Sequence, residues 1–400
     1  MSTRHPNLDA QQLEQCCNYD IAIIGGGPVG ASLAQALRGS KLKVCVLEAR
    51  PAGSTSQDAR ALALSYGSRL LLARLGIWEA LQDVSPIRTI HISQKQSFGR
   101  AVLHAEELNV PDLGYVLPYP ALQDALTAAM QHSSVASIYG ASVTQLTSEA
   151  DHAAISYQQD GAEHKLMTRL AVVADGGKLL AQQFPPKMRD YGQSALITHI
   201  TCSAPKPGTA FERFTPQGPL ALLPFKVGYE LVWTAPHQAA QEMLVWDDAK
   251  FLEALHQHFG DRVGEFLTVG KRTCFPLGLR RAPQQAPMPH VVLLGNAAQT
   301  LHPVAGQGFN MGLRDAWELA QEILDAKPEE LGAEKMLAAY RADRRTDREA
   351  GIRFTDGLVR LFSNDLPLVS AGRAAALTAL DCLPFAKKFV AKRMMFGANG

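Results

Sequence analysis

The sequence Ile21-Ala-Ile-Ile-Gly25-Gly-Gly27-Pro-Val-Gly30 joins a short apolar run to three glycines spaced G-x-G-x-x-G. The apolar run is typical of a buried parallel strand. Gly25 permits a tight turn, Gly27 lets the backbone approach a pyrophosphate, and Gly30 lets the next helix pack close to the sheet. The segment therefore predicts a strand, a phosphate-binding loop and a helix whose N-terminus favours anions.

An acidic residue supports this interpretation. Glu48 ends a second apolar strand at residues 43–47, about twenty residues beyond the glycines, as the dinucleotide fingerprint requires. A carboxylate there accepts hydrogen bonds from ribose hydroxyls and repels a 2′-phosphate, which favours FAD or NAD over NADP. A glycine-rich turn without a ligand would not need the strand, helix and acid in this order. The segment alone leaves FAD and NAD open.

Composition places the chain among ordinary globular proteins, with 400 residues, 46% hydrophobic and 19% charged. A net charge of +1 offers no basic surplus for nucleic acid. The six cysteines form no C-x-x-C pair, and this cysteine usage favours a reducing compartment. No metal-ligand cluster is visible in the sequence. No apolar stretch reaches the roughly 20 residues of a membrane span. Residues 1–18 are polar and predict a flexible leader, so we expect a cytoplasmic protein.

The patterning divides the chain into two interleaved parts. Residues 19–88, 118–180 and 288–345 predict a discontinuous Rossmann-like α/β domain, in which residues 61–81 are expected to be largely helical. Residues 89–117 and 181–287 show short strands separated by turns. We expect these strands to form an antiparallel β-sheet domain, inserted into the first domain and covering its ligand.

Residues 346–400 are expected to form a C-terminal helical segment. Residues 334–353 carry many charges, and a solvated helix with ion pairs is the preferred interpretation. Residues 383–396 interleave basic and apolar side chains. That segment either lies on a membrane surface or packs its apolar face on the body with its lysines in water.

Two later segments also place glycines after apolar strands. The first is Ala171-Val-Val-Ala-Asp175-Gly176, and the second runs from Val291 through Gly295-Asn296 and His302-Pro303 to Gly306-Gln-Gly308-Phe-Asn310. The order of the three segments resembles the flavoprotein aromatic hydroxylases, which are single-component FAD monooxygenases. The resemblance implies the para-hydroxybenzoate hydroxylase type of fold, with FAD as cofactor.

In that family the first segment holds the ADP half of FAD, the Asp-Gly segment lies near the pyrophosphate, and the third segment holds the ribityl chain and isoalloxazine. The resemblance implies these cofactor-binding residues: Gly25, Gly27, Gly30, Glu48, Arg60, Asp175, Gly176, Gly295, Asn296, Pro303, Gly306, Gln307, Gly308 and Asn310. Arg60 is alternatively a surface ion-pair residue. His302 is either an acid-base group or, as for most lone histidines beside proline, structural.

The chain departs from the family pattern at three places. Asn296 stands where Asp is usual, and Gln299 stands where His is usual. The hydroxyl and basic residues that usually follow the Asp-Gly segment are absent, which leaves Lys178 as a candidate cation for NADPH or NADH. A single G-x-G-x-x-G implies that this co-substrate visits a surface site only briefly.

One branch of the family is more similar, because Ala210–Leu220, Gly295–Pro303 and Thr355–Phe362 look like hydroxylases of 2-polyprenyl-6-methoxyphenol in bacterial ubiquinone synthesis. The resemblance implies that reduced flavin and dioxygen form a C4a-hydroperoxide that hydroxylates the phenol ring. The flavin carries this chemistry, with Pro303 and Gly306 on the peroxide side. Four apolar residues could line the substrate site or simply form a sheet core: Phe211, Phe214, Leu222 and Trp233.

The implied partners are a lipophilic polyprenyl phenol, other ubiquinone-biosynthesis proteins and a membrane surface, with a homo-oligomer as a further expectation. Localisation at the inner face of the cytoplasmic membrane would follow from the tail of the substrate. Two alternatives remain open. One is hydroxylation of another aromatic or another ring position. The other is a non-catalytic FAD-binding scaffold, which the departures at Asn296 and Gln299 would explain.

Overall fold

A computed structural model describes residues 17–55, 58, 60–95, 97–362 and 367–399. The expected leader at residues 1–18 lies outside the described residues, apart from Cys17 and Asn18. Asn18 donates its backbone N–H to the Met167 carbonyl and accepts the Met167 N–H at its side chain, both at 3.0 Å. This exchange fixes the start of the described chain to the first sheet.

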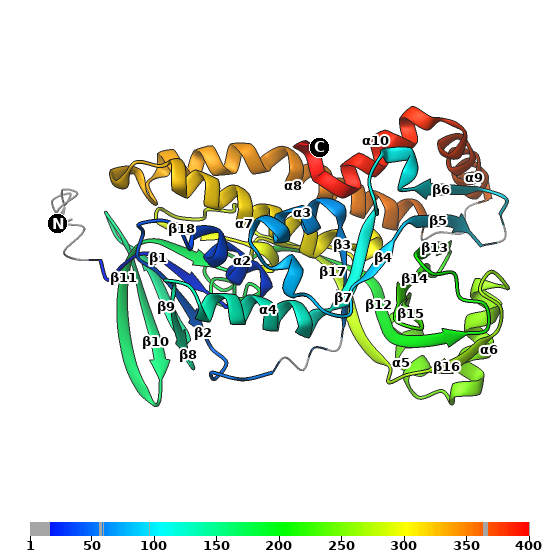
Figure 1. Cartoon of the computed structure of the whole chain (residues 1–400), viewed down its shortest axis with the longest axis horizontal. Coiled ribbons are helices and arrows are strands. Elements are labelled where there is room, and N and C mark those ends of the chain that lie inside the picture. Colours follow the sequence, from blue (N-terminus) through cyan, green and yellow to red (C-terminus); the bar gives the residue numbers. More distant parts are fainter. Residues whose placement is uncertain (1–16, 56–57, 59, 96, 363–366, 400) are drawn as a thin grey trace.

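A seven-stranded sheet forms the core of the half at the left of Figure 1. Its parallel strands are β8 (Ala136–Tyr139), β2 (Val44–Glu48), β1 (Tyr19–Ile24), β11 (Ala162–Val173) and β18 (Val291–Leu293). The antiparallel hairpin of β9 (Ser142–Ser148) and β10 (Ala153–Gln159) extends the sheet. Because β1, β11 and β18 are parallel neighbours, their carboxyl ends bring all three glycine segments to one edge.

Helices cover this sheet and hold the glycine segments in place. The principal ones are α2 (Pro28–Leu37), α3 (Tyr66–Arg74), α4 (Tyr119–Gln131) and α7 (Gln307–Asp325). In α2, the apolar side chains of Ala31, Leu33 and Leu37 are at most 1% exposed. A Cβ on Gly312 would lie 3.0 Å from the Val29 side chain, so α7 packs closely against the start of α2.

A nine-stranded sheet forms the core of the other half. Its strands, in spatial order, are β19 (Gln299–Thr300), β17 (Thr273–Arg281), β12 (Lys187–Cys202), β15 (Gly228–Pro236), β14 (Gly218–Phe225), β13 (Thr209–Thr215), β5 (Thr89–Gln94) and β6 (Arg100–His104), with β16 (Phe266–Val269) beside β12. Neighbours are antiparallel except β13 and β5, which are parallel. The expected Rossmann-like domain with an inserted antiparallel sheet is confirmed, except that β13 and β5 are parallel.

The prediction of a helix over residues 61–81 is wrong in its first part. Residues Ala61–Ser65 form strand β3, which pairs with β7 (Gly114–Pro118), and β7 also pairs with β4 (Ser85–Ile87). The alternation Ala-Leu-Ala-Leu has the period of a strand, and pairing with β7 satisfies it. Helix α3 starts only at Tyr66, where Ser65 accepts the backbone N–H of Ser68 at 3.2 Å.

Three helices follow α7: α8 (Glu334–Phe362), α9 (Pro367–Cys382) and α10 (Pro384–Phe396). Figure 1 shows α8 along the top of the molecule, with α9 and α10 above the end of the second sheet. Helix α5 (His237–Leu244) and helix α6 (Asp248–Phe259) cover the opposite face of that sheet. Short 3-10 turns occur at η1 (Trp78–Ala80), η2 (Glu106–Leu108), η3 (Gly295–Ala297), η4 (Val304–Gly306), η5 (Pro328–Glu330) and η6 (Gly397–Asn399).

The expectation of a solvated α8 is wrong for its inward face. Arg344 is 1% exposed, and its Nε donates to the Asp315 carboxylate of α7 at 2.7 Å. Its Nη2 donates to Asp347 at 2.7 Å, and Asp347 also accepts from Arg314 at 2.8 Å. Charge alternation along a helix looks the same whether the charges meet water or each other, so the sequence did not reveal this buried network.

Candidate active site

The first glycine loop leaves an open face beside the start of α2. Gly25 has φ +108°, and a Cβ on Gly30 would lie 2.1 Å from the Gly25 carbonyl oxygen, so both positions require glycine. At Gly27, by contrast, a Cβ would have no atom of the described residues within 4 Å. Within the same residues, no side chain caps the N-terminus of α2. The loop therefore presents uncapped backbone N–H groups to an anion.

Glu48 lies directly beside this loop. Its Oε2 accepts the Gly26 N–H at 2.8 Å, and its Oε1 accepts the backbone and side-chain N–H groups of Arg50, both at 2.9 Å. Burial by itself would raise the pKa of Glu48, but these hydrogen bonds outweigh it and hold the pKa below its usual value. Glu48, Arg50 and Gln123 help to line a cavity of about 230 Å³. An ionised carboxylate thus borders a space beside the phosphate loop.

The Asp-Gly segment serves as a turn that is fixed by its own carboxylate. Asp175 accepts the backbone N–H groups of Gly177 at 2.7 Å, Lys178 at 3.0 Å and Leu179 at 2.7 Å. Gly176 has open space where a Cβ would lie. The exposed side chain of Lys178 is consistent with the expected surface cation.

No sequence motif indicated Arg280, which joins the Asp-Gly segment to the third glycine segment (residues 291–310). Its guanidinium, carried by β17, donates to the carbonyl oxygens of Gly177 and Asn296, the latter at 2.8 Å. Gly295 packs on Val29, since a Cβ on Gly295 would lie 3.1 Å from the Val29 side chain. The Asn296 side chain is exposed at this edge of the sheet. Arg280 thus brings a positive charge to the ends of β11 and β18.

The third glycine segment continues into the start of α7. Pro303 is exposed, and Gly306 adopts the left-handed conformation (φ +61°) at the N-cap of this helix. No side chain among the described residues caps this helix start. The Gln307 side chain donates to the Met394 carbonyl at 3.3 Å, and Gly308 has open space at its Cβ position. The N-terminal end of α7 is therefore a second place that favours negative charge.

Asn310, expected to contact the cofactor, connects the elements around the site through its side chain. Its Oδ1 accepts from the Ser65 N–H at 2.8 Å and the Ser68 hydroxyl at 2.7 Å. Its Nδ2 donates to the Ala63 carbonyl at 3.0 Å and the Gly306 carbonyl at 2.7 Å. These four bonds use the capacity of the amide. Asn310 therefore fixes β3 and α3 to the loop at Gly306.

Gln299 has a comparable structural role. It is 4% exposed, donates to Asp315 at 2.8 Å and accepts from Arg348 at 2.9 Å. The usual histidine at this place is thus replaced by a side chain that joins the buried network of α7 and α8. This departure from the family pattern has a structural reason.

Arg60 and His302 both make structural contacts. Arg60 donates to Asp58 at 2.8 Å and lies over the Phe275 ring, 5.1 Å from its centroid. His302 is 1% exposed, and its Nδ1 accepts the Val304 N–H at 3.2 Å. Burial lowers the pKa of His302 to about 4, so the ring is neutral near pH 7.

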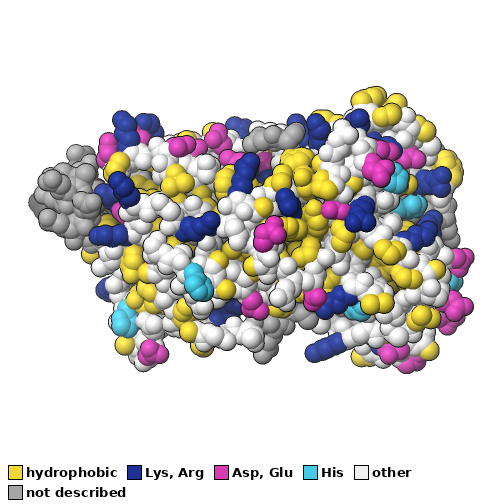
Figure 2. All heavy atoms as spheres, in the orientation of Figure 1, with side chains coloured by type: hydrophobic (Ala, Val, Ile, Leu, Met, Phe, Trp, Pro, Cys, Tyr) yellow, Lys and Arg dark blue, Asp and Glu magenta, His cyan; other side chains and the backbone are white. Residues whose placement is uncertain are grey.

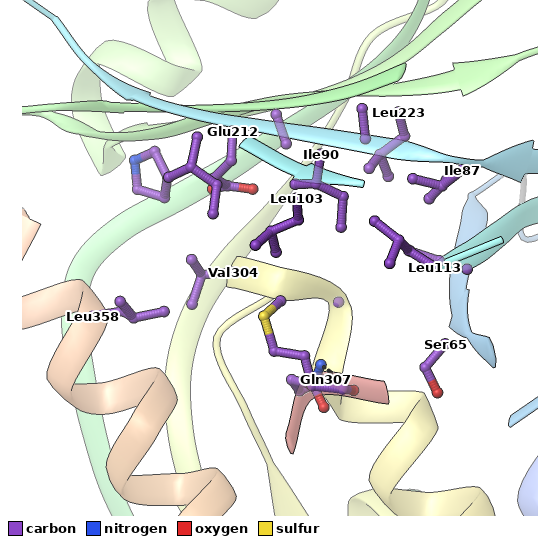
Figure 3. Close-up of a pocket in the computed structure, with 18 of the residues that line it drawn as sticks. Ser65, Ile87, Ile90, Leu103, Leu113, Glu212, Leu223, Val304, Gln307 and Leu358 are labelled. Carbon is purple, nitrogen blue, oxygen red and sulfur yellow. Dashed lines mark hydrogen bonds between the residues drawn. The ribbon is translucent and has the colours of Figure 1, made fainter. Parts of the chain in front are cut away.

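A cavity of about 280 Å³ lies between the second sheet and the start of α7. Figure 3 shows Ile90, Leu103 and Leu223 on one side and Val304 and Gln307 on the other. Helices α8, α9 and α10 add apolar residues to its wall. The cavity is thus an apolar space directly beside the helix end that favours negative charge.

The four residues expected at the substrate site divide between two faces of the sheet. Phe214 lines the cavity with its side chain. Phe211, three residues earlier on β13, places its ring on the opposite face, where its centroid lies 5.4 Å from that of the Phe259 ring of α6. Leu222 and Trp233 are buried on the opposite face, where Trp233 meets Phe251 of α6 with ring centroids 5.6 Å apart. The reason is the strand period of two, which sends neighbouring side chains to opposite faces.

Comparisons with known proteins agree with this geometry. Residues 18–355 match the FAD binding domain family. The ubiquinone hydroxylase UbiL of Rhodospirillum rubrum is 31% identical, over 94% of this chain and 89% of that protein. The 3-demethoxyubiquinol 3-hydroxylase of Escherichia coli is also 31% identical, over 90% and 94%. The structure of p-nitrophenol 4-monooxygenase from Pseudomonas putida superimposes with a TM-score of 0.74 at 17% identity, covering 95% of this chain and 98% of that one.

The chain belongs to the FAD binding domain family. Within it the chain is a flavoprotein aromatic-ring hydroxylase, an FAD-dependent monooxygenase that uses NAD(P)H and dioxygen. The described residues fit FAD at three points. The open loop at Gly27 suits the pyrophosphate, the cavity beside Glu48 suits the adenosine, and the uncapped start of α7 suits the anionic edge of the flavin.

Gly27→Ala is expected to weaken FAD binding by roughly ten- to a hundredfold while leaving the FAD-free protein as stable as before. The added methyl group enters the space where the phosphate would lie, and overpacking of this kind costs about 1–3 kcal/mol. Flavin fluorescence titration and the thermal midpoint of the apoprotein measure the two effects. Gly39→Ala, in an exposed turn with equally open surroundings, is the matched control and keeps full affinity. Equal affinity in both variants would contradict the placement of the phosphate.

Proposed function

We propose that this chain hydroxylates a 2-polyprenyl-6-methoxyphenol para to its hydroxyl group, giving the 1,4-benzoquinol in ubiquinone synthesis. The observation that carries the proposal is the apolar cavity beside the start of α7, in a chain that is 31% identical to two hydroxylases named for ubiquinone compounds. A phenol oxygen donates electron density to its para carbon. Electrophilic oxygen transfer to that carbon is therefore chemically apt.

FAD, when reduced by NADPH or NADH, supplies the activation of dioxygen. The chain positions the reactants and excludes water. Gly306 and the helix start behind it favour negative charge on the cavity side, by up to about 2 kcal/mol where the site is partly buried. The exposed Pro303 and the open space at Gly308 leave room for the ring against this edge. Phe214 and Leu223 on the sheet face supply apolar contact to the substrate.

The size of the cavity implies that the polyprenyl tail extends beyond it. A volume of about 280 Å³ lies just below the roughly 300–1,000 Å³ of pockets that hold a drug-sized ligand. Leu377, Leu380, Val390 and Met394 of α9 and α10 form part of the wall. We therefore infer that the tail leaves the cavity past these two helices.

The outer surface of α10 suits a membrane. Phe385 is 72% exposed and Phe389 is 60% exposed, whereas Lys387 is buried and donates to Glu107 at 3.1 Å. Helix α10 thus packs Ala391 and Met395 on the body but leaves the two aromatic rings at the surface. Lys388 and Lys392 are exposed beside the two rings, and Figure 2 shows hydrophobic and basic side chains interspersed in this region. We propose that α10 rests on the anionic inner face of the cytoplasmic membrane.

Within the described residues, no helix is both long and apolar enough to cross a membrane. The proposed association is therefore peripheral. Assembly with other proteins of ubiquinone synthesis, or into a homo-oligomer, is part of the same proposal. The support for such assembly is that these proteins would act on the same lipid substrates at the same membrane surface.

Replacing both Phe385 and Phe389 by serine is expected to weaken binding to phosphatidylglycerol vesicles at least tenfold, because burying one such ring contributes about 1.5–3 kcal/mol. Vesicle co-sedimentation measures the effect. Val227→Ser, at an 81% exposed residue of the β14–β15 turn, is the control and leaves binding unchanged. Unaltered binding of the double variant would rule out α10 as the contact.

The direct test of the function uses purified holoenzyme with NADPH and dioxygen. It compares 2-prenyl-6-methoxyphenol with the matching demethoxyubiquinol, because the Escherichia coli relative is named for that second substrate. The expected product is the 1,4-benzoquinol of the first compound. Conversion of the second compound alone would move the reaction to another ring position. Bound FAD that NADPH fails to reduce with either compound would favour the scaffold alternative.

A further inference from the structure

Glu212 is the one titratable side chain among the described residues that line the larger cavity. It belongs to β13, where Ala210 and Phe214 at alternate positions also line the cavity. Figure 3 shows its carboxyl group within the cavity, above the segment that carries Val304. An ionisable group in a wall that is otherwise uncharged and mainly apolar is costly to keep unless it has a function.

No hydrogen bond or ion pair to the Glu212 carboxyl occurs among the described residues. Arg213, the next residue, points away and donates to the His258 carbonyl at 2.8 Å. His91 of β5 lies against Phe211, with ring centroids 5.7 Å apart. The cavity-lining residues of β5, β14, the Val304–Gln307 segment, α8, α9 and α10 carry no charge. Glu212 is thus available to a ligand.

The electrostatic state of Glu212 suits a base. Burial raises its pKa to about 7, with no charged neighbour contributing to the shift. A general base works best when its pKa is near the operating pH. A buried carboxylate with a strong ion-pair partner would be a much weaker base, because the partner lowers its pKa.

We propose that Glu212 binds the phenolic hydroxyl of the substrate and accepts its proton during hydroxylation. This inference rests on the proposed function. The O–H bond breaks, its electron pair stays on the phenolic oxygen, and the proton bonds to a Glu212 carboxylate oxygen. No oxidant or reductant is needed for this step.

The timing of the transfer follows from acidity. A phenol has a pKa near 10 in water, about three units above that of Glu212. The proton therefore moves mainly as the ring gives electron density to the incoming oxygen, because that change makes the hydroxyl more acidic. Deprotonation in turn strengthens donation to the para carbon. Proton acceptance by Glu212 therefore favours hydroxylation at the para carbon.

Glu212→Gln tests the inference, because glutamine keeps the size of the side chain and one acceptor oxygen but does not take up a proton. The expected result is a loss of about 10²–10⁴-fold in kcat. The dissociation constant for 2-prenyl-6-methoxyphenol, measured with the oxidised holoenzyme, is expected to change less than tenfold. The wild-type kcat is expected to rise with pH through about 7, and this rise is absent in the variant. Glu212→Asp, which retains the carboxyl, is expected to recover part of the rate and the pH dependence.

Glu230→Gln is the matched control. Glu230 is 7% exposed on strand β15 of the same sheet, lies outside the cavity lining and pairs with His199 at 3.3 Å. Its kcat and pH profile are expected to match the wild type. If Glu212→Gln hydroxylates the phenol at the wild-type rate with the wild-type pH profile, the role of Glu212 is refuted while the function stands. If the wild type neither binds nor hydroxylates the phenol, the function and the inference fall together.

Discussion

Asp315→Asn is expected to lower the free energy of unfolding by about 3–5 kcal/mol, because it removes one of the two carboxylates that pair with the buried Arg344 and leaves Asp347 alone to balance Arg314 and Arg344. Asp315 is 0% exposed and accepts from Arg344 and Gln299, at 2.7 and 2.8 Å. Asparagine has nearly the same shape, so the loss comes from charge and not from packing. Urea unfolding at a fixed FAD concentration, followed by circular dichroism, measures it.

Glu334→Gln on the neighbouring helix α8 is the control for this prediction. Glu334 pairs with Arg341, but its side chain is 65% exposed. Water and salt screen such a pair, and its removal is expected to cost less than about 1 kcal/mol. Losses of equal size in the two variants would show that the buried network does not stabilise the contact of α7 with α8.

Glu212→Gln is expected to make the protein more stable at pH 8 by at most about 3 kcal/mol, and to leave its stability unchanged near pH 4.5. The limit follows from a pKa raised from 4.5 to about 7, at 1.36 kcal/mol for each unit. Removing the carboxyl group thus has opposite consequences for turnover and for stability. Opposite effects on activity and stability are expected of a group that destabilises the fold but is needed for function.

The sign follows from proton uptake in the two states. Because the folded pKa exceeds the unfolded one, the folded protein binds more protons between pH 4.5 and 7. The wild type therefore loses stability as the pH rises through this range, and glutamine removes that loss. Thermal unfolding of both proteins at pH 4.5, 6 and 8 tests the prediction. His302 titrates alike in both proteins, so the difference between them isolates Glu212. A constant difference at all three pH values would contradict the raised pKa.

The sequence was a good guide where one residue type alone meets a geometric requirement. A Cβ on Gly30 would lie 2.1 Å from a backbone oxygen, and the left-handed conformation of Gly306 needs glycine, so these positions were recognisable by spacing. Asn310 and Gln299 were less predictable. A motif indicates that an amide lies near the cofactor, but not whether the amide faces the cofactor or the scaffold behind it.

Residues brought together by strand pairing were missed for a different reason. Arg280 reaches Gly177 from a position 103 residues further along the chain, and no local pattern encodes that contact. Glu212 did leave a signal. It occupies an inward position of the alternation Ala210, Glu212, Phe214, where a strand that packs on an apolar core would carry a third apolar residue. A carboxyl in that place, once the strand face is known, indicates a site.

The contacts of α10 bear on when the protein becomes functional during its synthesis. The Ser65 hydroxyl donates to the Met395 carbonyl at 2.8 Å, across 330 residues, and the Asp347 carboxylate accepts the Ala398 N–H at 2.8 Å. A ribosome therefore completes the nucleotide loop of Gly25–Gly30 long before it adds the residues that close the substrate cavity. A nascent chain could hold the cofactor while its cavity is still open. Closure of the cavity by α10 would then follow formation of the cofactor site.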